Sequence, residues 1–185
     1  GAYSDGKFNI TAEFGGWMTD DLPEEEVLDL IRYVDAINLK HGAPDNITNP
    51  HTKEVYEIEK RAMGAGLKLL RSEVRHLGTE ASYEIYGKLE KFLIENGVEI
   101  KFKTMITDIL TSYRNGYDEI IGVADMDDNE YYAPKVVVGA GREGSAWFKT
   151  ICEKHNINTS PGTVDIGVRV ECRDEVMKEL NKAMY

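Results

Sequence analysis

The residues best suited to chemistry form a glycine-rich turn that follows an apolar run. Gly139, Gly141 and Gly144 match the spacing Gly-x-Gly-x-x-Gly, with the apolar run 135–138 before them and a helical pattern after them. Glycines let a backbone approach a ligand closely, and free amides at a helix start can face an anion. Asp165 follows at about the 20-residue interval of a dinucleotide fingerprint. The same glycines would also suit a plain tight turn, so both interpretations stay open.

Too few residues follow this turn to complete a Rossmann half, and a dinucleotide fold that began here would leave the upstream pattern unexplained. The turn is therefore interpreted as a second contact to a ligand. Arg142 and Glu143 within it could act at that ligand, or could form an ion pair at the helix terminus.

A second candidate is the pair Arg75 and His76, at the end of a predicted strand and just ahead of a helix. Loops at this position carry ligands in open parallel sheets. Histidine changes its protonation near neutral pH, so His76 could exchange a proton with a bound molecule. Alternatively, Gly78 and Thr79 only cap the helix, and the two basic side chains are solvated.

The elements that must position these residues follow from hydrophobic periodicity and turn residues. Helices are predicted from about 22 to 42 (apolar face Val27, Leu30, Ile31, Val34), and over 53–63, 79–96, 145–154 and 174–185. Strands are predicted over 67–74, 98–102, 105–113, 119–126, 131–138 and 164–170.

Turn chemistry predicts how the central strands pair. Asn115-Gly116 is a strong hairpin signal, and residues 127–129 suit a second turn, so the three runs between 105 and 138 should form an antiparallel meander. The run 135–138 is apolar without alternation, which is typical of a strand buried on both faces of a parallel sheet.

Composition narrows the function. A net charge of -11 and a pI near 4.9 argue against nucleic acid or an anionic membrane as a partner. Cys152 and Cys172 have no zinc-site spacing, and the four histidines form no metal-ligand pattern, so no metal is expected. No apolar run reaches the length of a membrane span, and a cytoplasmic location is the expectation.

The order of helix, Gly97, strand, meander and the segment 136–141 resembles the FAD domain of two-domain flavoproteins related to glutathione reductase. In those proteins the closing strand ends in an Ala-Thr-Gly-like turn beside the flavin. Here Gly139-Ala140-Gly141 stands at that place, without the threonine.

A finer resemblance, to a group of uncharacterised FAD-dependent dehydrogenases, rests on the segments 1–7, 75–79 and 164–171. The segment 6–11, Gly-Lys-Phe-Asn-Ile-Thr, is also similar to a Gly-Arg-Cys-Asn-x-Thr segment that runs past the cofactor in related flavoproteins. Lys7 replaces the arginine and Phe8 replaces the cysteine.

The resemblance implies an α/β fold: a partial FAD-binding, Rossmann-like domain with parallel strands and a three-stranded antiparallel meander. That domain would span 1–162, with a helical segment at 22–65 and the meander at 105–138, and 163–185 would begin a truncated substrate domain. The strand, Gly-x-Gly-x-x-Gly turn and helix that open such a fold are not in the chain, which is interpreted as an internal fragment. Sheet edges left open by the missing strand would favour a homo-oligomer or coverage by terminal segments.

The resemblance also implies the site. The cofactor is FAD, with NAD(P) as a second candidate, and the substrate is a small molecule. Catalysis is assigned to His76 and Arg75. Cofactor binding is assigned to Ser4, Asp5, Gly6, Lys7, Met105, Ile106, Gly139, Ala140, Gly141 and Arg142.

The leading functional interpretation is thus a fragment of a flavin-dependent oxidoreductase, inactive on its own. The alternatives are a non-catalytic α/β interaction module and one part of a split flavoprotein. For Ser4 to Lys7 the alternative is an exposed terminus, and for 104–106 a plain strand start.

Overall fold

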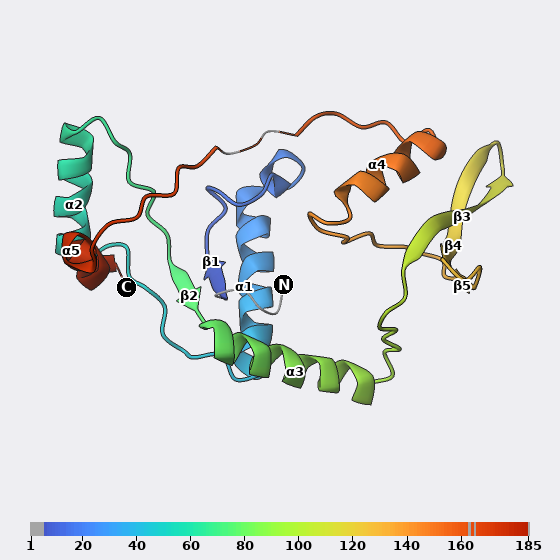
Figure 1. Ribbon diagram of the computed structural model, residues 1–185, viewed down its shortest axis with the longest axis horizontal. Coiled ribbons are helices and arrows are strands. Elements are labelled where there is room, and N and C mark those ends of the chain that lie inside the picture. The colour runs from blue at the N-terminus through green and yellow to red at the C-terminus, as the bar shows by residue number, and fades with distance from the viewer. Residues whose placement is uncertain (1–5, 163, 165, 185) are drawn as a thin grey trace. The chain divides into compact units, whose positions relative to one another are not determined.

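The computed structural model describes residues 6–162, 164 and 166–184, and its helices and strands are drawn in Figure 1. The chain divides into two compact units, residues 1–99 with 169–185 (unit 1) and residues 100–168 (unit 2). Among the described residues, no helix is long and apolar enough to cross a membrane.

Unit 1 is mainly helical and contains one small sheet. Its elements are β1 (Lys7–Asn9), the 3-10 helix η1 (Met18–Asp20), α1 (Glu24–Lys40), α2 (Lys53–Gly64), β2 (Val74–His76), α3 (Thr79–Glu95) and α5 (Asp174–Met184). The four α-helices confirm the predicted helices of this region to within a few residues.

Local signals explain where these helices begin and end. Three glutamates fill the first turn of α1, where they favour the positive end of the helix dipole. Thr52 caps α2 by accepting a hydrogen bond from the Val55 amide at 3.3 Å. Gly42 and Gly97 follow α1 and α3 with positive φ angles of 101° and 86°, as predicted for helix stops.

The two strands of unit 1 pair antiparallel, with Lys7 opposite His76 and Asn9 opposite Val74. The predicted strand 67–74 is wrong for most of its length, because only Val74 belongs to a strand. The β1 partner is three residues long. The Val74 amide and carbonyl bond to Thr48 at 2.9 and 3.0 Å, and one further bond between the two segments runs from the Ile10 amide to the Glu73 carbonyl at 2.8 Å.

Unit 2 contains the predicted meander. β3 (Ile106–Arg114), β4 (Tyr117–Asp125) and β5 (Glu130–Tyr132) pair antiparallel in that order, followed by α4 (Ser145–Lys154). Asn115 and Gly116 both have positive φ, 53° and 91°, as a two-residue hairpin turn requires. Both predicted turns, the meander and the helix are therefore confirmed.

Several predicted strands are not formed in the described residues. The runs 98–102 and 133–138 are not strands, and Val137, predicted to be buried, is 95 % exposed. Strand-forming segments make stable strands only beside a pairing neighbour, and no strand of the described chain pairs with either run. The described chain thus combines helices with two antiparallel sheets, and it does not show the predicted parallel strands.

The predicted strand 164–170 is also not formed in its described part, because residues 166–170 are exposed and lie outside any strand. Asp165, the acidic residue of the dinucleotide spacing, lies outside the described residues.

Each unit has its own small apolar core. In unit 1 the buried apolar side chains are Val27, Val55, Ile58, Leu77 and Ile85. In unit 2 they are Ile109, Ile151 and Cys152, which pack α4 against β3.

Candidate functional site

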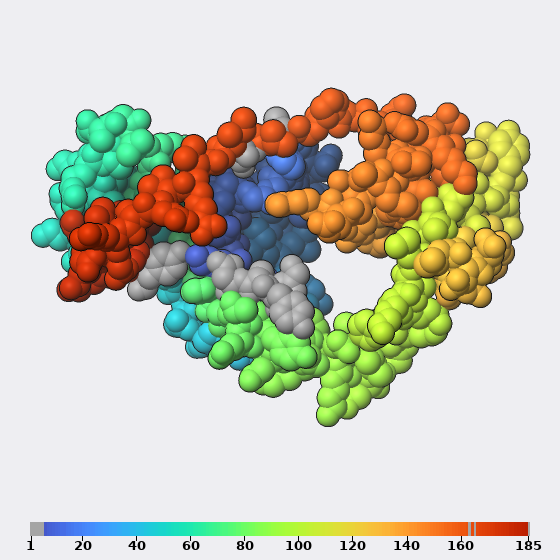
Figure 2. Space-filling view, viewed as in Figure 1, coloured from blue at the N-terminus to red at the C-terminus, as the bar shows by residue number. Residues whose placement is uncertain are grey.

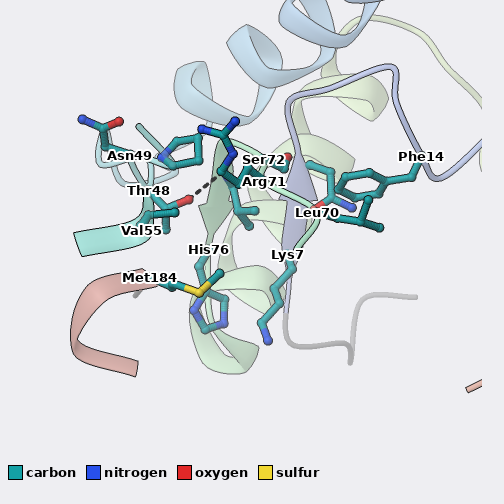
Figure 3. Close-up of a pocket in the computed structure, with 13 residues that line it drawn as sticks. Lys7, Phe14, Thr48, Asn49, Val55, Leu70, Arg71, Ser72, His76 and Met184 are labelled. Carbon is teal, nitrogen blue, oxygen red and sulfur yellow. Dashed lines mark hydrogen bonds between the residues drawn. The ribbon is translucent and has the colours of Figure 1, made fainter. Parts of the chain in front are cut away.

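A pocket of about 220 Å³ lies in unit 1 on one face of the β1–β2 pair. Figure 3 shows its wall, to which the strands, the loop 48–50, the segment 70–72 and the end of α5 contribute. The volume is below the roughly 300–1,000 Å³ of pockets for drug-sized ligands, so the site suits a smaller molecule.

Strand alternation explains which side chains reach this pocket. Cross-strand partners share a face of a sheet, so Lys7 and His76 point to the same side, and Figure 3 shows both extending beside Met184. Phe8 and Arg75 point to the opposite face, toward α1. Two sequence-predicted site residues, Lys7 and His76, are thereby brought together, although they are far apart in the chain.

Arg75 belongs to a buried ion pair rather than to the pocket. Its side chain is 2 % exposed. The Nε and Nη2 atoms donate to the two Asp35 carboxylate oxygens at 2.5 and 2.7 Å, and Nη1 donates to the Pro44 carbonyl at 2.5 Å. The hydrogen bond to Asp35 raises the pKa of Arg75 further above its usual range. These contacts tie β2 to α1 and to the loop after it, which is a positioning role.

Arg71 forms part of the pocket wall and has one donor atom without a partner among the described residues. Its Nε lies 3.2 Å from a Glu59 carboxylate oxygen, and its guanidinium lies 4.6 Å from the centre of the Tyr56 ring. The hydrogen bond with Tyr56 raises the pKa of Arg71, and the nearby Glu59 carboxylate adds to the rise. The Nη1 atom is enclosed and has no hydrogen-bond partner among the described residues.

Gly6 lies where only a glycine fits. Its φ is +65°, and a Cβ placed on it would come within 2.0 Å of the Ser82 hydroxyl oxygen. Ser82 is fully buried in α3, and the Gly6 carbonyl accepts a hydrogen bond from the Leu77 amide at 2.9 Å. The backbone before Lys7 is therefore packed directly against α3. Ser4 and Asp5, the two preceding predicted site residues, lie outside the described residues.

The remaining predicted site residues belong to unit 2. Met105 is exposed and precedes β3, and its carbonyl accepts a hydrogen bond from the Met126 amide at 3.0 Å. Ile106 is the first residue of β3.

Residues 139–144 form the predicted turn, with Gly141 at a φ of +64° and no described atom within 4 Å of a Cβ placed on it. Gly139, Ala140 and Arg142 are all exposed, and the Arg142 carbonyl accepts a hydrogen bond from the Ser145 hydroxyl at 2.9 Å. The turn leads into α4 as predicted. The strand that should precede it is absent from the described residues.

Two acidic side chains of unit 2, Asp125 and Asp108, form hydrogen bonds that stabilise the unit. Asp125 accepts hydrogen bonds from the Asp127 and Asn129 amides, at 2.9 and 3.0 Å, and from the Tyr131 hydroxyl at 2.8 Å. Desolvation alone would raise the pKa of Asp125, but these donors lower it to about 2. Asp108 bonds to Lys154 and lies 3.0 Å from the His155 ring, which fastens the end of α4 to β3.

Sequence reasoning missed Asp35 and Arg71. A signal for Asp35 exists, because it continues the four-residue spacing of Val27 and Ile31 on the apolar face of α1. A carboxylate on such a face implies a buried cationic partner. No pattern in the chain pointed to Arg71.

Among the described residues, no group of three or more His, Cys, Asp or Glu side chains could hold a metal ion. No family model, curated protein or solved structure matches the chain.

Proposed function

We propose that the chain is part of a flavin-dependent oxidoreductase whose redox chemistry is carried by FAD. The observation that supports this most is the pairing of β1 with β2. The two segments involved, 6–11 and 75–79, are both among those that resemble flavoproteins, and their predicted residues Lys7 and His76 are direct cross-strand partners. The register thus unites two independent parts of the resemblance at one pocket.

The residues present suit such a cofactor in their chemistry. At Gly6 the backbone itself, without a Cβ, forms the surface beside Lys7, and the Lys7 ammonium group could neutralise a pyrophosphate oxygen. In unit 2 a ligand could approach the exposed backbone around Gly141 closely, and the backbone at Met105 and Ile106 could contact an adenine. When bound, FAD would supply hydride or electron transfer.

The chain's own side chains would hold and assist the reactants. His76 would exchange a proton with a molecule in the pocket, because its ring lines that wall. Arg75 would act indirectly, by fixing β2 and hence the direction of His76.

In the complete protein, residues 1–162 would belong to a Rossmann-like FAD-binding domain, and a second domain would begin at residue 163. The largely exposed segments 98–102 and 136–138 support this arrangement, because each has strand-forming residues without a strand neighbour in the described residues. Further strands of the same protein, or a second copy of the chain, would pair with them.

The test is the visible absorption of the complete protein, purified without added cofactor, with Lys7→Ala, His76→Ala and Lys149→Ala variants beside it. We expect flavin bands in the wild type, weaker bands in Lys7→Ala, and normal bands but slower flavin reduction in His76→Ala. Lys149 is an exposed lysine of α4, and its variant is the control for loss of one charge.

Absence of flavin from the wild type, even after FAD is added, would refute the proposal. It would favour the non-catalytic interaction module. Flavin that appears only after a second protein is added would identify the chain as one part of a split flavoprotein.

A further inference from the structure

The pocket beside β1 and β2 carries a charge opposite to that of the chain as a whole. The chain has 33 acidic and 22 basic residues. The described residues that line the pocket nevertheless include two cations, Lys7 and Arg71, and no carboxylate. A positively charged wall favours the binding of an anion and disfavours that of a cation.

Neutral polar groups lie among these cations. Asn9 and Asn49 contribute amide donors to the lining, and Thr48 and Ser72 contribute hydroxyl groups. The Ser72 hydroxyl already donates to the Glu73 carbonyl at 2.9 Å. The Thr48 hydroxyl, which accepts the Val74 amide at 2.9 Å, can still donate its O–H. The pocket can therefore offer several uncharged hydrogen bonds to an oxygen anion.

Arg71 is the side chain best prepared to anchor such an anion. Its side chain is about three-quarters buried, and it is held between the Tyr56 ring and the Glu59 carboxylate. Only Nε is used by Glu59, and the enclosed Nη1 has no partner in the described residues. An enclosed donor without an acceptor is unfavourable, and an arriving carboxylate would remove that cost.

The rest of the lining is apolar and comes from several elements: Phe14, Pro50, Val55, Leu70, Val74 and Met184. Inorganic phosphate would leave this surface uncovered. A molecule with a flat carboxylate at one end and a small apolar body would cover it, and the guanidinium fork matches a carboxylate in two parallel hydrogen bonds.

We infer that this pocket binds a small organic carboxylate with an apolar body, anchored by Arg71. The further step, that this carboxylate is the substrate of a flavin enzyme, rests on the proposed function. The binding of the carboxylate to the pocket is independent of that function.

The test is an NMR titration of the intact chain without flavin, with the methionine methyl groups labelled. Met184 lines the pocket, whereas Met126 belongs to unit 2 and is the internal control. The probes are benzoate, the neutral analogue benzamide, and inorganic phosphate. We expect benzoate to shift the Met184 signal saturably, and benzamide and phosphate to bind at least about fivefold more weakly.

Two matched variants assign the anchor. Arg71→Gln should weaken benzoate binding about fivefold, and Arg71→Lys, which keeps the charge without the fork, should fall between. Arg61→Gln is the control, because Arg61 also pairs with a glutamate, Glu179, but does not line the pocket. Denaturant unfolding of each variant verifies that it is folded.

Equal binding of benzoate and benzamide would overturn the inference, as would phosphate binding as tight as benzoate. Unchanged benzoate affinity in folded Arg71→Gln would overturn the assignment of the anchor. Because no step uses flavin, this inference and the flavin proposal can fail separately.

Discussion

The two units each enclose a carboxylate, and they stabilise it in opposite ways. In unit 1, Asp35 is paired with a cation that lies 40 residues away in the sequence, and the pair joins a helix, a strand and a loop. In unit 2, the described residues that donate to Asp125 include no cation, and they lie within six residues of it. A long-range pair fixes tertiary structure, whereas a local set of donors fixes a turn. Mutations at the two sites should therefore differ in size and in pH dependence.

Breaking the long-range pair should have the largest effect. Arg75→Met leaves Asp35 buried without its cation, which costs about 3–5 kcal/mol of the free energy of unfolding of unit 1. Denaturant unfolding followed by Trp17 fluorescence, in a Trp147→Phe background, measures it. The double variant Arg75→Met with Asp35→Leu should regain part of the loss, and equal stability of the single variant and wild type would contradict the comparison.

A smaller effect is expected where α4 meets β3. Partial burial raises the pKa of Asp108, but hydrogen bonds from Lys154, His155 and the Ile109 amide lower it overall. Asp108→Asn removes the charge from this contact and should cost about 1 kcal/mol, because Lys154 is largely exposed. Trp147 donates to the Thr107 carbonyl at 3.1 Å, so its fluorescence reports the loosening in a Trp17→Phe background. Glu153→Gln, on an exposed pair of the same helix, should be near neutral.

A third effect is expected for Asp125→Asn, whose amide oxygen can still accept the two backbone bonds but whose NH2 group would face the Asn129 and Tyr131 donors. The difference from wild type should be largest at neutral pH and should shrink in acid. The folded pKa of Asp125 is about 2 and the ordinary value is 3.8, so its stabilisation is present above pH 3.8 and is lost as the pH falls through 2. Unfolding of unit 2 in wild type should therefore depend on pH in this range, and the dependence should be weaker in Asp125→Asn. The same pH dependence of unfolding in wild type and in Asp125→Asn would contradict the assignment of this stabilisation to the Asp125 carboxylate.

Much of the fold could be predicted because the relevant signals are local. The helix periodicity from Val27 to Val34, and the turn Asn115-Gly116, act within a few residues and give correct elements. The strand 98–102 was predicted as a strand-like run and 135–138 from its apolar content, but a strand also needs a neighbour, which local sequence does not specify.

The candidate site was predictable only in part, for the same reason. Lys7 and His76 were each selected separately, and only the β1–β2 register shows that they are partners. Arg75 was expected to face a ligand because it follows a predicted strand, and the structure instead places it opposite Asp35. One residue of difference along a strand reverses the face, which a prediction accurate to a few residues cannot resolve.

The burial of Cys152 makes the packing of α4 on β3 observable in time. Its side chain is 2 % exposed, while Cys172 in unit 1 is open to solvent. A thiol reagent should modify Cys172 at once and reach Cys152 only when α4 separates from the meander. The slow phase of labelling would then count the opening events of unit 2 in the native protein, just as protected amides count local unfolding by hydrogen exchange.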